Sequence, residues 1–116
     1  MSHRKWKVRI RHMLEAIGRV LDYTRGMDLD AFRIRLETVD AVIRNFQVLG
    51  EAGRLVPETI REKYPEIPWK VICGMRNVLV HDYDRVRVDY LWDSIHNDLP
   101  PLIPLLTRIL EQELDE

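Results

Sequence analysis

Residues 75–83, MRNVLVHDY, place several polar groups that can bind a phosphate within an otherwise apolar stretch. Arginine presents a planar fork of donors that matches phosphate oxygens, and it stays charged at any working pH. Histidine titrates near neutrality and can therefore take up or release a proton. Arg76 and His81 together would suffice, without a metal, for attack of a ribose 2′-hydroxyl on its phosphodiester, with His81 as general base or acid. Because DNA lacks that hydroxyl, this chemistry predicts selectivity for RNA.

The helix predicted for this stretch does not gather these groups on one face. On an α-helix, Arg76 and His81 are about 140° apart around the axis and roughly 7.5 Å apart along it. Asn77 and His81 are separated by one helical turn and share a face. Two copies of the helix around a two-fold axis would bring both sets of side chains into one cleft, with Gly74 allowing close approach. A homodimer would therefore gather more of these polar side chains in one site than a single chain could.

The spacing alone also has a structural interpretation. His81 can cap the last carbonyls of the helix while Arg76 forms a structural ion pair. Tyr83 can be a half-buried ring that closes the helix end. An arginine followed at this distance by a histidine is a short motif that arises by chance in an arginine-rich chain, so on the pattern alone the structural interpretation is favoured.

The composition is that of an ordinary globular protein. The chain has 116 residues, of which 46% are apolar, so we expect one domain over 1–116. The formal net charge is -1, so any contact with nucleic acid must be local. The single cysteine, Cys73, and four histidines without metal-site spacing lead us to expect no metal and no cofactor. Without a signal sequence or a membrane-spanning apolar run, the expected location is the cytoplasm, away from membranes.

Helical periodicity dominates the chain and predicts an all-α antiparallel bundle of four or five helices. Glycines, prolines and aspartates mark the helix ends. The expected helical segments are 6–23, a short turn with Asp28 and Asp30 as candidate N-caps, 36–55, 57–63, about 68–81, and a region from 88 to 113. In the last region, either Asp98 caps a new helix with the prolines in its first turn, or the prolines kink one long helix.

Two basic segments outside the motif are candidates for RNA contact. Arg85 and Arg87 follow the motif directly, although aspartates among them dilute the local charge. The N-terminal segment HRKWKVRIRH could guide an RNA backbone, with Trp6 stacking on a base. We favour its interpretation as the solvated face of the first helix, with Trp6 in the core and His12 on the polar face. The Gly-Ala-rich segment 50–54 is expected to pack against another helix, with a subunit contact as one option.

The longer stretch PEIPWKVICGMRNVLVHDY resembles the active-site helix of the HepT-like family of HEPN toxins, whose motif is R-x4-H-x-Y. RNVLVHDY matches that motif at every fixed position. Two further segments, LETVDAVIRNFQVLGEAGRLVPE and DYLWDSIHNDLPPL, are similar to the second long helix and the C-terminal helix of the family. The resemblance therefore covers roughly residues 7–110.

This resemblance implies a HEPN-like, all-helical homodimer that is the metal-independent endoribonuclease toxin of a toxin–antitoxin pair. Its partner would be a nucleotidyltransferase antitoxin that neutralises the toxin by transferring AMP to the motif tyrosine. By position, Arg76 and His81 would be catalytic, Asn77 would support the site, and Tyr83 would accept AMP. The alternative, from a different functional class, is a non-catalytic helical module that docks a nucleotidyltransferase, with Arg76 and Asn77 holding a nucleotide.

Overall fold

The computed structural model describes residues 5–77 and 87–113, and within these ranges it contains seven α-helices, one 3-10 helix and no strand. The elements are α1 (Lys5–Tyr23), α2 (Leu29–Ile34), α3 (Leu36–Arg54), α4 (Glu58–Lys63), α5 (Trp69–Gly74), η1 (Met75–Asn77), α6 (Val88–Asn97) and α7 (Leu102–Gln112). The all-α prediction is confirmed, although the helices are more numerous than expected and three of them are only six residues long. In the same ranges, no helix is both long and apolar enough to cross a membrane.

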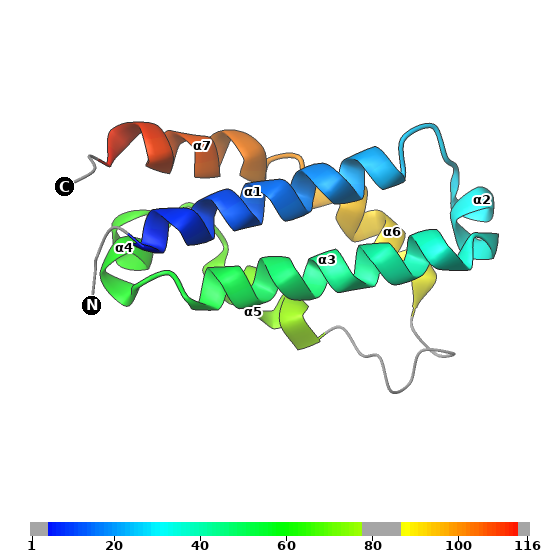
Figure 1. The fold of residues 1–116 in the computed structure, drawn as a ribbon, viewed down its shortest axis with the longest axis horizontal. Coiled ribbons are helices and arrows are strands. Elements are labelled where there is room, and N and C mark those ends of the chain that lie inside the picture. The colour runs from blue at the N-terminus through cyan, green and yellow to red at the C-terminus, as the bar shows by residue number, and fades with distance from the viewer. Residues whose placement is uncertain (1–4, 78–86, 114–116) are drawn as a thin grey trace.

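The helices α1 and α3 lie side by side and run antiparallel along the molecule (Figure 1). On its other sides, α1 packs against α7, and α3 packs against α2, α5 and η1. The two long helices bury the apolar faces that their helical spacing predicts, and each fully buried aliphatic side chain contributes about 1.5–3 kcal/mol relative to exposure. Their buried apolar residues include Ile10, Met13, Ile17, Val20, Val39, Val42, Ile43, Phe46 and Leu49.

Local signals set the turn between α1 and α2. Gly26 has a φ of 78°, in the left-handed region that favours glycine, and it lies in the turn where the sequence predicts the end of the first helix. Asp28 is the N-cap of α2, and its Oδ1 accepts a hydrogen bond of 2.8 Å from the Ala31 N–H. Both predictions are confirmed, because these signals depend on only a few neighbouring residues.

The prolines near residue 100 separate two helices rather than kink one. Asp98 is the C-cap of α6, and its carboxylate accepts a hydrogen bond of 2.8 Å from the Ser94 hydroxyl. Pro101 is the N-cap of α7, so that helix begins three residues later than a helix capped by Asp98 would. Pro104 falls in the first turn of α7, where its missing N–H leaves no helical hydrogen bond unmade.

The end of α7 is tied to α1 and α4 around Glu113. Its carboxylate accepts a hydrogen bond of 2.5 Å from the Tyr64 hydroxyl and pairs with Lys63 at 2.8 Å. Its backbone carbonyl accepts a hydrogen bond of 2.6 Å from Lys7 Nζ. Burial, together with the bond to Glu113, raises the pKa of Tyr64 to about 12, so the phenol stays protonated. Lys7 is itself buried, so this basic residue does not belong to a solvated face.

The helix predicted over 68–81 begins as expected but changes its geometry at Met75. The indole of Trp69 donates a hydrogen bond of 3.0 Å to the Tyr64 carbonyl and anchors the start of α5. The α-helix ends at Gly74, and η1 continues to Asn77. A 3-10 helix turns by about 120° per residue instead of about 100°. The angular spacing expected for a continuous α-helix is therefore not kept at the start of the motif.

Candidate active site

The six site residues predicted from the sequence fall into two groups. Those that the structure describes are Arg76, Asn77 and Arg87, and those that lie outside the described residues are His81, Tyr83 and Arg85. Arg76 and Asn77 are the last two residues of η1, and both are exposed. Arg87 is the N-cap of α6, after the segment 78–86. The structure therefore locates the start of the motif, and the roles of the other residues stay predictions.

The backbone of Arg76 lies directly against α3 at Gly50. A Cβ added to Gly50 would lie 2.3 Å from the Arg76 amide nitrogen and 2.9 Å from the Ile72 carbonyl oxygen. Side-chain carbons do not approach backbone atoms this closely, so the contact requires glycine. One turn further along, a Cβ on Gly53 would lie 2.9 Å from Cγ2 of Ile72. The prediction that segment 50–54 packs against another helix is confirmed, and the surface it meets is α5 and η1 of the same chain.

The carboxylate of Glu51 binds the guanidinium of Arg76. Glu51 Oε1 accepts a hydrogen bond of 3.2 Å from Arg76 Nη1. Arg54 donates to the same carboxylate through Nη2 at 2.7 Å and Nε at 3.2 Å. The bond from Arg54 is the main cause that lowers the pKa of Glu51 to about 2, and the bond from Arg76 acts in the same direction. Glu51 is therefore ionised at neutral pH and holds both arginines.

This arrangement positions Arg76 without removing it from solvent. The Arg76 and Glu51 side chains are each 45% exposed, and exposed ion pairs contribute little to stability because water screens them. In the contacts that the structure describes, Arg76 uses one of the five N–H donors of a guanidinium. The remaining donors can bind a phosphate, so the structural ion pair and a catalytic role are compatible.

Arg87 is bound by its own helix. Its Nε and Nη2 donate hydrogen bonds of 3.3 and 3.1 Å to the Asp89 carboxylate. The guanidinium also lies 4.0 Å from the centre of the Tyr90 ring. The bond with Asp89 raises the pKa of Arg87 and lowers that of Asp89. An RNA phosphate would have to compete with the Asp89 carboxylate for this guanidinium. The RNA contact of Arg87 therefore stays a prediction.

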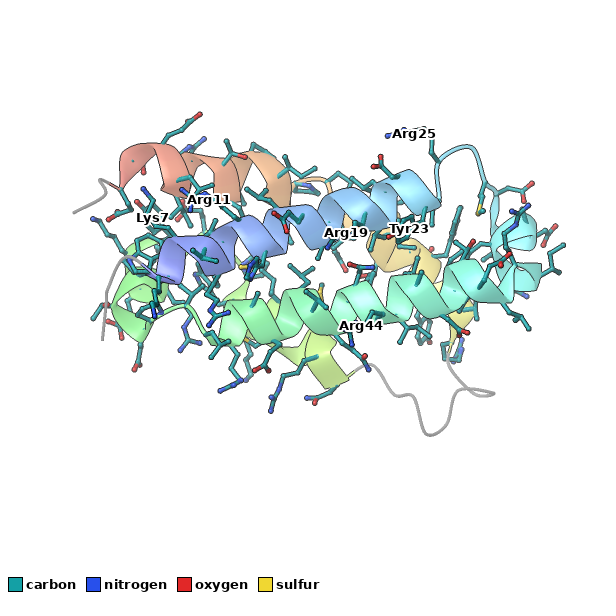
Figure 2. The ribbon with its side chains drawn as sticks, in the orientation of Figure 1. Lys7, Arg11, Arg19, Tyr23, Arg25 and Arg44 are labelled. Atoms are coloured by element: carbon teal, nitrogen blue, oxygen red, sulfur yellow. The ribbon has the colours of Figure 1, made fainter. Side chains whose placement is uncertain are left out.

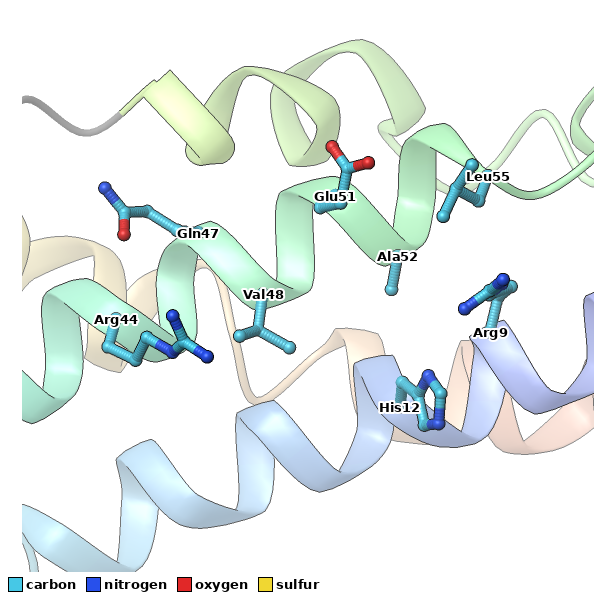
Figure 3. Close-up of a pocket in the computed structure, with 8 residues that line it drawn as sticks. All are labelled: Arg9, His12, Arg44, Gln47, Val48, Glu51, Ala52 and Leu55. Carbon is cyan, nitrogen blue, oxygen red and sulfur yellow. The ribbon is translucent and has the colours of Figure 1, made fainter.

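A groove of about 350 Å³ opens between α1 and α3 beside this site (Figure 3). Its polar lining residues are Arg9, His12, Arg44, Gln47 and Glu51, and its apolar lining residues are Val48, Ala52 and Leu55. Arg9 and His12 are half-buried, whereas the favoured interpretation of the sequence was a solvated basic face on the first helix. Glu51 belongs both to the groove and to the contact with Arg76. The sequence did not indicate that Glu51 holds Arg76, because the two residues are 25 positions apart in the chain.

Comparison with known proteins finds related sequences along most of the chain. A family model described as "Ribonuclease HepT-like" matches residues 13–109. A Methanocaldococcus jannaschii protein named "Putative RNase MJ1380" is 34% identical over 102 residues, which cover 88% of this chain and 94% of that protein. The "Probable ribonuclease HepT" of Thermococcus cleftensis is 34% identical over 101 residues, which cover 87% of this chain and 89% of that protein.

A longer relative contains the same region as one part of a larger protein. "Gamma-glutamylcyclotransferase and putative RNase MJ0434" of Methanocaldococcus jannaschii is 36% identical over 110 residues, which cover 95% of this chain. The match covers 49% of that protein, so the chain spans about half the length of this relative. No solved structure matches the chain.

Proposed function

Because the chain belongs to the HepT-like ribonuclease family, as its motif predicts, we propose that it is a metal-independent endoribonuclease. The observation that carries the proposal is the placement of Arg76 at the start of the motif. Its backbone is seated on Gly50, its guanidinium is held by Glu51, and the side chain remains open to solvent. A fixed guanidinium that keeps free donors is suited to bind a phosphodiester and the anion that forms from it.

In the proposed reaction the RNA supplies its own nucleophile. The 2′-oxygen attacks the adjacent phosphorus, the bond from phosphorus to the 5′-oxygen breaks, and a 2′,3′-cyclic phosphate forms. His81 takes the proton from the 2′-hydroxyl or donates one to the leaving 5′-oxygen. Arg76 stabilises the negative charge on the pentacoordinate phosphorus, and Asn77 supports the site with an amide donor.

The proposed active form is a homodimer. Val71 and Gly74 lie three residues apart on one face of α5, and Gly74 comes two residues before Arg76. Val71 is 56% exposed, and a Cβ on Gly74 would meet nothing within 4 Å. An exposed apolar side chain beside an exposed glycine leaves room for close approach by a second copy. A two-fold axis at this face would bring two copies of Arg76 to one cleft.

The proposed biological role is that of a cytoplasmic toxin, neutralised by a nucleotidyltransferase antitoxin that transfers AMP to Tyr83. The support is the intact R-x4-H-x-Y motif, in which Tyr83 lies two residues after His81. An AMP group on this tyrosine would add bulk and negative charge where the substrate phosphate has to bind. Modification would therefore oppose RNA binding both by occlusion and by charge repulsion.

The purified protein is expected to cleave RNA, but not DNA of the same sequence, with EDTA present, because the nucleophile is the ribose hydroxyl. Electrophoresis of end-labelled oligonucleotides measures the cleavage and identifies the cyclic phosphate. The His81→Ala variant is expected to lose about 10²–10⁴-fold in rate. Cleavage of DNA, or loss of activity in EDTA, would contradict the mechanism. Tight binding of AMP or ATP without any cleavage would favour the non-catalytic module.

Co-expression with the nucleotidyltransferase antitoxin is expected to add AMP to Tyr83 and to abolish RNA cleavage. Intact-mass measurement followed by peptide mapping locates the modification. The matched control is Tyr83→Phe, which keeps the ring and removes the acceptor oxygen, so its mass is expected to stay unchanged and its toxicity to persist. AMP found on the Tyr83→Phe variant would show that another residue is the acceptor.

A further inference from the structure

The groove between α1 and α3 holds arginines that have no acidic partner among the described residues. Arg9 comes from α1 and Arg44 from α3, and in Figure 3 they lie toward opposite ends of the groove with His12 between them. Neither arginine makes an ion pair or a side-chain hydrogen bond with any residue within 5–77 and 87–113. Arg9 is nevertheless half-buried, so part of its solvation is lost without a compensating carboxylate.

Within the part of the chain that the structure describes, one acidic residue lines the groove, and it does not cancel the positive charge of the arginines. Glu51 is already bound by Arg54 and Arg76, and the three side chains together carry one positive charge. The chain as a whole has a formal net charge of -1, so the positive charge of the groove is a local feature. Figure 2 shows that Arg19 also lies along α1, and it is exposed. The field at this face therefore favours a polyanion.

The rest of the lining suits the apolar part of a nucleotide. Val48, Ala52 and Leu55 are small or aliphatic, and Figure 3 shows Val48 and Ala52 on the side of α3 that faces α1. Apolar surface of this kind can contact a ribose or the face of a base while arginines bind phosphate. The volume of about 350 Å³ is at the lower end of the range for ligand sites, roughly 300–1,000 Å³, which fits a nucleotide segment of a strand.

We propose that this groove binds the backbone of single-stranded RNA beside the cleavage site, with Arg9 and Arg44 on phosphates. The proposal rests on the proposed ribonuclease function and deepens it by adding a substrate-binding subsite. Continuity with the active site supports it, because Glu51 lines the groove and also holds Arg76. In Figure 3 the Glu51 carboxylate points away from α1, so a strand in the groove would have to pass over α3 at Glu51 to reach the Arg76 guanidinium. The basic start of α1 then contributes to substrate binding instead of only facing solvent.

The experiment separates binding from cleavage. In a His81→Ala background, Arg9→Gln combined with Arg44→Gln is expected to weaken binding of a single-stranded RNA oligonucleotide by about tenfold or more at low salt. The slope of log K against the logarithm of the salt concentration is expected to become less steep by roughly 0.7 for each phosphate contact removed. Fluorescence anisotropy over a salt series measures both quantities. In the chain that keeps His81, the same two substitutions are expected to raise KM and leave kcat unchanged.

The matched control is Arg33→Gln combined with Arg108→Gln, two exposed arginines on α2 and α7, outside the groove. It removes the same charge, so any effect of net charge alone appears in both double variants. Circular dichroism and thermal melting check that both fold.

Equal RNA affinity of the groove variant and the control would overturn the proposal. The proposal would also be overturned if the groove variant kept its RNA affinity but lost self-association or binding to the nucleotidyltransferase. The groove would then be a protein interface. Absence of cleavage by the native chain would instead overturn the proposed function, and the binding comparison would still decide the role of the groove.

Discussion

Replacement of Arg76 by alanine is expected to lower the rate of RNA cleavage by about 10²–10³-fold, because the developing negative charge loses its preorganised donor. The fold is expected to persist, since the Arg76 side chain is exposed and its described contact is one screened ion pair with Glu51. Single-turnover cleavage measures the rate, and size-exclusion chromatography measures the oligomeric state, which is expected to stay unchanged. The Arg76→Lys variant keeps the charge but not the planar fork, so it is expected to be intermediate.

The matched control for this prediction is Arg54→Ala. Arg54 binds the same carboxylate as Arg76, with the shorter bond of 2.7 Å, but it does not belong to the motif. Its loss is expected to reduce cleavage much less than the loss of Arg76. If both variants lose activity equally, the effect comes from the ion-pair network around Glu51, and Arg76 has no separate catalytic role. Native cleavage rates in Arg76→Ala would refute the assignment directly.

The Gly50→Ala substitution is expected to impair both stability and cleavage. The added methyl would lie 2.3 Å from the Arg76 amide nitrogen, so α5 and η1 would have to move away from α3. Overpacking of this kind lowers the free energy of unfolding by about 1–3 kcal/mol. Displacement of a catalytic group by about 1 Å can reduce the rate by about 10²-fold. Urea denaturation measures the first effect, and kcat of the fully folded fraction measures the second.

Gly18→Ala on α1 is the matched control for Gly50→Ala. A Cβ at Gly18 would meet nothing within 4 Å, so alanine is expected to stabilise the helix by about 0.5–1 kcal/mol and to leave cleavage unchanged. Gly53→Ala is a second comparison, because there the methyl would meet Cγ2 of Ile72, a buried β-branched side chain, so it overpacks the same helix contact without touching the backbone of Arg76. A Gly50→Ala protein that is as stable and as active as the native chain would show that the close contact does not position Arg76.

The parts of the fold that depend on local patterns could be predicted from the sequence. The apolar spacing of α1 and α3 predicted a buried face on each helix, and the residues Ile10, Ile17, Val42 and Phe46 are indeed buried. Asp28 and Asp30 were both candidates to cap α2, because an N-cap acts within three residues, and the structure has Asp28 as the cap with Asp30 in the first turn. The family could be predicted from the motif for the same reason, since R-x4-H-x-Y is contiguous in the chain.

Of the parts that depend on tertiary contacts, the packing of segment 50–54 against another helix was predicted, but its partner and the contacts that follow were not. The change from α5 to η1 at Met75 occurs where the backbone meets Gly50, and the apolar spacing of this stretch does not indicate it. The contact of Glu51 with Arg76 joins two helices that are far apart in the sequence. The groove needs α1 and α3 to be side by side before Arg9 and Arg44 share a surface. The roles of His81 and Tyr83 stay predictions, because both lie outside the described residues.

The contact between Gly50 and the backbone of Arg76 fixes the start of the motif but not the residues that follow it. Arg76 is anchored to α3 through its own backbone at Gly50, so its position is set upstream of the segment 78–86. An insertion or deletion within that segment would shift the remaining motif residues relative to the guanidinium without moving the guanidinium itself. A change in the number of residues between Asn77 and His81 would thus alter the spacing of Arg76 and His81 without displacing Arg76, whereas position 50 would tolerate almost no replacement.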